Sequence, residues 1–79
     1  METKPKRIAR TKVNDYTVNT TQLGDKYETA VKLEDRDYII VQNYTNLASA
    51  EVGHKHWCRV CEDNPIYATD VNENKQKVF

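Results

Sequence analysis

The chain has 79 residues and a mass of 9.2 kDa, which allows one small domain, because chains divide into several cores only at larger sizes. Its residues are 38% hydrophobic and 30% charged, and twelve Lys and Arg balance twelve Asp and Glu, as is typical of a soluble globular chain. The longest apolar run is Tyr38–Val41 and the first ten residues lack an apolar segment, so the sequence predicts neither a membrane span nor a secretory signal.

The first part of the chain is basic. Residues 1–12 hold five cationic side chains against one acidic side chain, so the remainder of the neutral chain carries a net charge of −4. Pro5 and the scarcity of apolar residues predict a flexible basic arm over residues 1–7. A weak alternating pattern over residues 8–18 predicts an irregular strand or hairpin, and a single domain is expected over 8–72.

This basic segment favours a nucleic-acid ligand as an alternative function, because Lys and Arg neutralise phosphates. The acidic remainder of the chain argues against that function, as does the lack of a basic stripe interleaved with aromatic residues. The side chains on which the alternative depends are Lys4, Lys6, Arg7, Arg10 and Lys12.

The strongest local pattern follows the turn signal Gly24-Asp25. Residues 27–33 predict a half-buried strand, because one face would carry the larger apolar and β-branched side chains and the other face the charged or small ones. The first face has Tyr27, Thr29, Val31 and Leu33, and the second has Glu28, Ala30 and Lys32. Residues 34–37 are all charged, and residues 38–44 are rich in β-branched and aromatic side chains. The segment 27–44 therefore predicts an antiparallel hairpin.

The hydrophobic period changes at Thr45, which with Asn46 is a candidate helix cap. Apolar and small residues then recur every three or four positions and predict a helix over about 46–62, which ends before Pro65. Gly53 lies in the middle of this helix and indicates a close approach between the helix and the sheet.

Residues 66–71 predict a closing strand, and residues 73–79 predict a polar C-terminal tail. The predicted fold class is α+β, with a small antiparallel sheet of three to four strands packed by one helix.

Every His, Cys and Trp of the chain lies in residues 54–61, and three interpretations of this cluster stay open. In the first, zinc is held by His54, Cys58 and Cys61, which share one helix face and are ligand types that zinc accepts. Structural zinc sites usually draw further ligands from a second element, and the chain offers no second pair.

In the second interpretation, Trp57-Cys58-x-x-Cys61 is the redox motif of thioredoxin-like proteins, although there the first thiol lies at a helix N-terminus. In the third, which is the expected one, Trp57 and the two cysteines are core residues with free thiols, and no cofactor is predicted.

The hairpin also predicts a contact surface. If the second strand alternates regularly, Tyr38, Ile40 and Tyr44 share one face while Ile39 and Val41 lie on the other. One helix covers only one face of a sheet, so the other face needs the N-terminal segment or a second molecule. We therefore expect Tyr38, Ile40 and Tyr44 to bind a protein partner, and a homo-oligomer is a further expectation.

The sequence contains no recognisable catalytic motif, and its two glycines leave few places where backbone can cradle a ligand. We expect the protein not to be an enzyme.

Residues 27–57 resemble short uncharacterised proteins of tailed bacteriophages. In those proteins a strand that begins Tyr-Glu-Thr is followed by a strand that ends Tyr-Thr and by a helix with Ala-x-x-Gly-His. The corresponding segments here are Tyr27-Glu28-Thr29, Tyr44-Thr45 and Ala50-Glu51-Val52-Gly53-His54.

The resemblance implies a phage-encoded accessory protein that acts by stoichiometric binding to a host enzyme or a defence component in the bacterial cytoplasm. A component of the virion or of its assembly is the alternative.

Overall fold

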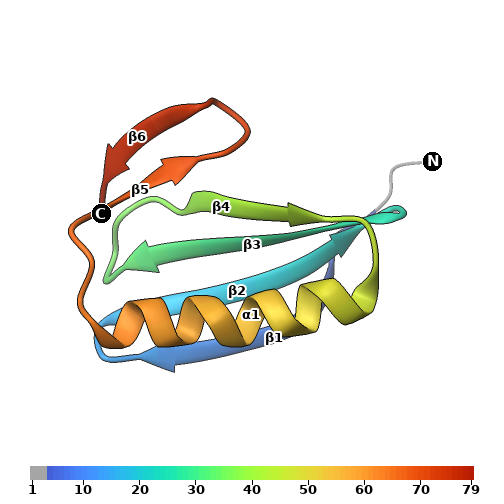
Figure 1. Ribbon diagram of the computed structural model, residues 1–79, viewed down its shortest axis with the longest axis horizontal. Helices are drawn as coiled ribbons and strands as arrows, with labels where there is room; N and C mark the ends of the chain where they lie inside the picture. The colour runs from blue at the N-terminus through green and yellow to red at the C-terminus, as the bar shows by residue number, and fades with distance from the viewer. Residues whose placement is uncertain (1–3) are drawn as a thin grey trace.

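The computed structural model describes residues 4–79 and begins with a four-stranded antiparallel meander. The strands are β1 (Lys6–Val13), β2 (Tyr16–Leu23), β3 (Lys26–Leu33) and β4 (Ile39–Tyr44), and they lie side by side in chain order (Figure 1). The turn after β1 places Asn14 at φ 53°, and the turn after β2 places Gly24 at φ 66°. Asn and Gly tolerate this left-handed conformation, which permits connections of two residues between these strands.

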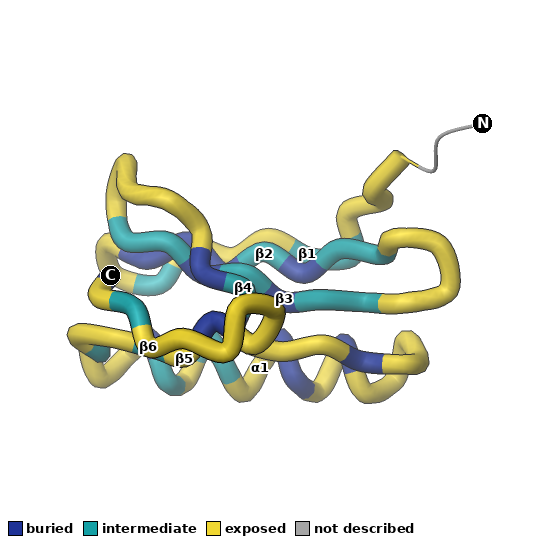
Figure 2. The backbone as a smooth tube through the Cα atoms, turned by 90° about the horizontal axis from the view of Figure 1, so that it is seen from above, coloured by how far each residue is buried: buried dark blue, intermediate teal, exposed yellow. Residues whose placement is uncertain are grey.

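One helix, α1 (Leu47–Glu62), follows the sheet. Asn46 caps it, because the Asn46 side chain accepts a hydrogen bond of 2.8 Å from the Ser49 amide. Asn64 has a φ of 52° and precedes Pro65, so the chain leaves the helical conformation at this point. Figure 2 shows sheet and helix as two layers, and the predicted α+β fold class, hairpin and helix are confirmed.

The chain ends in a second, two-stranded sheet made of β5 (Tyr67–Asp70) and β6 (Lys75–Val78). Asp70 stabilises the turn of this hairpin, since its Oδ1 atom accepts hydrogen bonds of 3.0 Å from the amides of Asn72 and Glu73. The Val71 amide donates to the Ile40 carbonyl, which attaches the hairpin beside β4.

The predicted C-terminal tail over 73–79 is wrong, because Phe79 is buried in the core. Its ring meets the ring of Tyr16 edge to face, with centroids 5.5 Å apart. Arg36 donates a hydrogen bond to the Phe79 carbonyl, and the Phe79 amide bonds to Ile66. Residues 75–77 are polar because they lie in the surface strand β6, and the burial of Phe79 fixes that strand in place.

The predicted basic arm over residues 1–7 is wrong at its C-terminal end, because Lys6 and Arg7 already belong to β1 and pair with β2. Residues 1–3 lie outside the described part of the chain. Most of the basic segment is therefore an edge strand, and its cations occupy fixed positions.

The core lies between the sheet and α1. Val18 and Val31 from the central strands and Cys61 from the helix are fully buried. Tyr16 and Ile39 are buried beside them, and Trp57 and Cys58 pack against this cluster from the helix.

Candidate functional site

A continuous chain of polar side chains crosses the interface between α1 and the sheet. His54 Nε2 lies 2.9 Å from Thr11 Oγ1, and His54 Nδ1 lies 2.7 Å from Thr20 Oγ1. The chain continues over 2.7 Å from Thr20 to Thr29 and over 3.0 Å from Thr29 to the Tyr44 hydroxyl. We call these five residues the polar relay; all except Thr11 are buried.

The polar relay has a hydrogen-bond partner for both nitrogens of the His54 ring, so the buried imidazole is fully satisfied. Burial lowers the pKa of His54 below its usual value, because the protonated ring loses solvation in the interior. The geometry therefore favours a neutral histidine that joins helix to sheet.

The same interface between α1 and the sheet requires a glycine at position 53. A Cβ atom at this position would lie under 3.0 Å from the hydroxyl and ring carbons of Tyr44. The expected close approach is correct, although the group that approaches is a side chain. Tyr44 is held in turn by its bond to Thr29, so Gly53, Tyr44 and His54 lock the helix at one position.

The two cysteines are free and lack the properties of reactive thiols. Burial, followed by the neighbouring Cys58, raises the pKa of Cys61 to about 11. Burial is also the largest cause of the raised pKa of Cys58. Since the thiolate is the nucleophile, this pair does not match an activated redox motif.

The zinc alternative also fails on geometry. Both His54 nitrogens are bonded to threonines, so neither points a lone pair at Cys58 and Cys61. Across residues 4–79, no three His, Cys, Asp or Glu side chains converge as metal ligands. The shared helix face of His54, Cys58 and Cys61 therefore does not create a zinc site, because threonines of the sheet already bond to the His54 imidazole.

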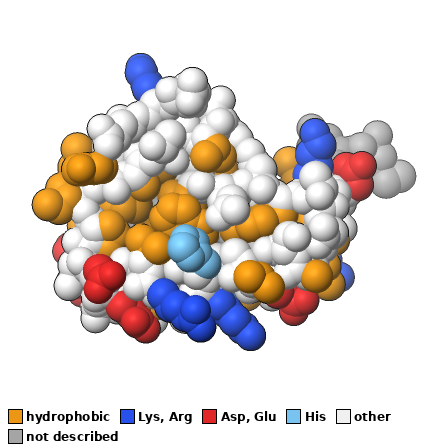
Figure 3. All heavy atoms as spheres, in the orientation of Figure 1, with side chains coloured by type: hydrophobic (Ala, Val, Ile, Leu, Met, Phe, Trp, Pro, Cys, Tyr) orange, Lys and Arg blue, Asp and Glu red, His pale blue; other side chains and the backbone are white. Residues whose placement is uncertain are grey.

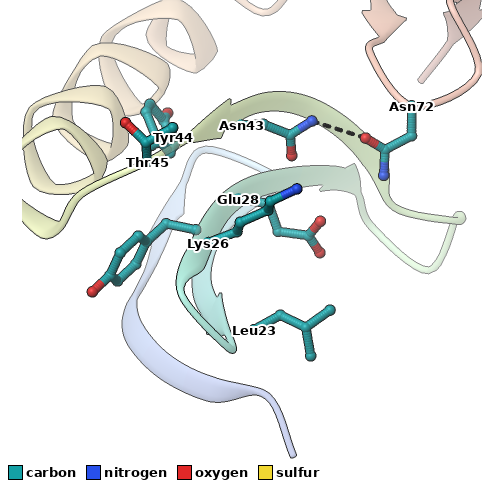
Figure 4. A pocket seen from close by; sticks show the side chains of 8 residues that line it. Leu23, Lys26, Glu28, Asn43, Tyr44, Thr45 and Asn72 are labelled. Carbon is teal, nitrogen blue, oxygen red and sulfur yellow. Dashed lines mark hydrogen bonds between the residues drawn. The ribbon is translucent and has the colours of Figure 1, made fainter. Parts of the chain in front are cut away.

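A hollow of about 410 Å³ lies at the end of the sheet where β2 turns into β3. Figure 4 shows Leu23, Lys26 and Glu28 on one side of it, while Tyr44 lies beside the helix. The bond drawn there joins Asn43 to Asn72 over 2.9 Å. The polar groups do not converge on one point, as they do in a small-molecule site.

The predicted contact face is only partly correct, because β4 contains a bulge. Ala30 pairs with Ile40 and Thr29 pairs with Gln42, so Val41 is the extra residue between them. The bulge reverses the alternation beyond it and turns Tyr44 toward the helix, where it is 7% exposed. Tyr44 is therefore not part of an exposed face.

The two other predicted contact residues remain near the outer face, which is the sheet face opposite α1. Ile40 is half-buried and Tyr38 is 38% exposed. The Lys32 ammonium lies 5.0 Å from the centre of the Tyr38 ring. These two side chains are too few to make an apolar face that requires cover.

Sequence reasoning missed a cluster of apolar side chains on the β5–β6 hairpin. Ile66, Tyr67 and Val78 are 71%, 57% and 73% exposed, and Tyr67 and Val78 face each other across the two strands. We call these three residues the hairpin cluster. The sequence carried one sign of this surface, which is the pair of apolar residues Val78 and Phe79 at the C-terminus. Only the folded hairpin shows that these residues lie opposite Tyr67 and Ile66.

A comparison of the chain with known protein families, curated proteins and solved structures finds no match. In the part of the chain that the structure describes, no helix has the length and hydrophobicity that a membrane span requires.

Proposed function

We propose that this protein is a non-enzymatic, phage-encoded accessory protein that binds one protein partner of the bacterial host through the hairpin cluster. The observation that carries the proposal is the exposure of Ile66, Tyr67 and Val78 on one small hairpin. Clustered exposed apolar side chains mark contact surfaces more often than isolated ones do, and Tyr is enriched at the centres of interfaces.

The surroundings of the hairpin cluster support this assignment. Figure 3 shows hydrophobic side chains at the end of the molecule near the C-terminus and in a band beside the helix. Inward-facing residues of the same hairpin fix it to the domain, since Ala68 packs on the core and Asp70 is buried. The cluster is thus presented on a supported element, which lowers the entropy lost on binding.

The phage origin in this proposal is supported by the residues that carry the resemblance. Thr29, Tyr44 and His54 belong to the polar relay, and Gly53 makes room for Tyr44. The shared motif therefore describes how helix and sheet are joined, so it supports a common fold more than a common activity. The partner surface lies outside the motif, on residues 66–78.

The partner that fits is a folded protein with an apolar pocket able to receive Tyr67. The test is an affinity pull-down from nuclease-treated bacterial lysate with three tagged baits: the wild type, the double variant Tyr67→Ser/Val78→Ser, and the control Leu47→Ser/Val52→Ser. The control also removes two exposed apolar side chains, but from α1. Retained proteins are quantified by mass spectrometry.

We expect the wild type and the helix control to retain the same protein at near-equal stoichiometry, and the hairpin variant to lose it. Equal retention by all three baits refutes the hairpin cluster as the contact surface. Recovery of the bait alone refutes a stoichiometric partner in the host tested, and attention then moves to self-association and to incorporation into the virion.

A further inference from the structure

The hydrogen bonds of the polar relay share one direction, because each hydroxyl has a single proton to donate. Thr20 Oγ1 lies 2.7 Å from His54 Nδ1 and 2.7 Å from Thr29 Oγ1, so it donates to one of them and accepts from the other. The same holds for Thr29, which lies between Thr20 and the Tyr44 hydroxyl. The donors between Tyr44 and His54 therefore all point toward the imidazole ring, or all point away from it.

The Tyr44 end of the relay fixes this direction. Tyr44 is buried, and within residues 4–79 its hydroxyl has one hydrogen-bond partner, Thr29 Oγ1, at 3.0 Å. A phenolic proton turned away from Thr29 would have no acceptor in the chain, which is costly for a buried group. Tyr44 thus donates to Thr29, Thr29 donates to Thr20, and Thr20 donates to His54 Nδ1. The Nδ1 atom accepts and carries no proton, so the network assigns the proton of neutral His54 to Nε2.

The Thr11 end of the relay agrees with the same tautomer. His54 Nε2 lies 2.9 Å from Thr11 Oγ1 and donates to it, so the Thr11 proton is free for another acceptor. Burial raises the pKa of the Cys58 thiol, and a hydrogen bond with the Thr11 hydroxyl opposes that rise. A hydroxyl lowers the pKa of a thiol by donating to the thiolate form. Thr11 therefore donates toward Cys58 and accepts from His54.

Protonation of His54 is incompatible with this direction. A protonated imidazole has two N–H donors and no acceptor, so Nδ1–H must donate to Thr20 Oγ1. Thr20 then turns its proton to Thr29, and Thr29 turns its proton to the Tyr44 oxygen. The Tyr44 proton is displaced from the relay. The one covalent change is the new Nδ1–H bond, formed with a proton from solvent, and each other step is the rotation of a hydroxyl.

The displaced Tyr44 proton has a place to go. The Tyr44 hydroxyl oxygen is the atom nearest to the position of a Cβ on Gly53. Both residues line a hollow of about 590 Å³ between β4 and α1, together with Gln42, Ser49 and His56. A Tyr44 hydroxyl that no longer donates to Thr29 therefore becomes a hydrogen-bond donor at this hollow.

We propose that the polar relay is a pH-operated switch, in which protonation of His54 reverses the hydrogen bonds from Nδ1 to Tyr44 and turns the Tyr44 hydroxyl into a donor at the hollow between β4 and α1. The relay thereby transmits the protonation state of a buried ring to the surface through Thr20 and Thr29. The switch does not use the hairpin cluster, so it stands or falls independently of the proposed protein partner.

Charged neighbours leave this control to the ring itself. Within residues 4–79, no ion pair includes His54, and burial is the cause that lowers its pKa. Two of the ionisable groups at the same interface, Lys6 and Glu51, are charged at neutral pH, and both are exposed and screened by water. By register and helical spacing, the ionisable side chains on the surfaces facing the ring are, besides Tyr44, Lys6 of β1, Tyr16 of β2, Tyr27 of β3, and Glu51, Cys58 and Cys61 of α1.

The test is a pH titration by NMR in the His56→Asn variant, where His54 is the single histidine. The histidine carries ¹⁵N in its ring and the tyrosines carry ¹³C in theirs, and Tyr44→Phe identifies the Tyr44 signals. Near neutral pH we expect a proton on Nε2 and none on Nδ1. As the pH falls through the folded-state pKa of His54, Nδ1 should gain a proton and the Tyr44 ring signals should shift with the same midpoint.

The variant Thr29→Val removes the hydroxyl that joins Thr20 to Tyr44, so the Tyr44 signals should cease to follow the titration of His54. Thr29→Ser restores a hydroxyl and should restore the coupled shift. The matched control is Thr17→Val, which removes the hydroxyl of a threonine that is 9% exposed and lies outside the relay, and it should keep the coupled shift. Thr20→Val interrupts the relay at the preceding bond and replaces Thr29→Val if that variant does not fold.

A proton on Nδ1 near neutral pH overturns the assigned direction. Tyr44 signals that ignore the titration of His54, or that follow it equally after the relay is interrupted, overturn the switch. The amide spectrum at each pH verifies the fold, and unfolding of the His56→Asn protein before His54 titrates also overturns the switch.

Discussion

The substitution Gly53→Ala distinguishes helix propensity from tertiary packing, because the two predict opposite signs. Within a helix, Ala is more favourable than Gly by about 1 kcal/mol. The added Cβ would, however, lie under 3.0 Å from the Tyr44 hydroxyl and ring. Tyr44 is buried and bonded to Thr29, so it cannot yield without losing that bond and its packing. Overpacking of this kind costs about 1–3 kcal/mol, and loss of the hydrogen bond adds about 1 kcal/mol.

The expected net result is a loss of about 1–3 kcal/mol in the free energy of unfolding, measured by urea denaturation. In a domain of this size, that loss lowers the melting temperature by roughly 4–24 °C. The decisive control is the same substitution in a Tyr44→Ala background, where the clash is absent and Gly53→Ala should stabilise the protein. Stabilisation by Gly53→Ala in the wild-type background would refute the proposed packing of Tyr44 beneath the helix.

Three further predictions follow from the same packing. The pKa of His54 is lowered in the folded state, so the unfolded chain binds more protons than the folded chain below about pH 6.5. The free energy of unfolding should therefore decrease as the pH falls from about 6.5 to the folded-state pKa. Urea titrations at several pH values should show this decline in the His56→Asn variant but not in His54→Gln; an identical pH dependence in both variants contradicts the assignment. Phe79→Ala should cost about 3–5 kcal/mol in thermal or urea unfolding, because the ring is buried against Tyr16, whereas a cost under about 1 kcal/mol would mean that the end of the chain is not fixed in the core. Because the pKa of Cys61 is raised to about 11 and the side chain is buried, its reaction with a thiol reagent near neutral pH should be much slower in the folded protein than in urea, and equal rates would contradict its burial.

The two ends of the chain form different surfaces of the domain. The basic segment at the beginning forms β1 and places its cations on the outer face. The segment after Pro65 folds back as a hairpin and exposes Ile66, Tyr67 and Val78.

Local patterns in the sequence determined the central elements of this protein. The alternation over residues 27–33, the charged break and the β-rich segment 38–44 predicted the hairpin that β3 and β4 form. The cap at Asn46 and the helical spacing up to Glu62 predicted α1 within a residue or two. These predictions succeeded because each depends on side chains that are neighbours along one element.

Tertiary structure decided which side chains reach which face of the sheet. A bulge at Val41 turned Tyr44 from the expected contact face into the core, and a bulge at Ile8 aligned Arg7 with Arg10. One extra residue in a strand leaves composition and period almost unchanged, yet it exchanges the faces of every residue beyond it. The sequence by itself determined which residues form strands and helix, and only the pairing between strands decided which side chains meet the solvent.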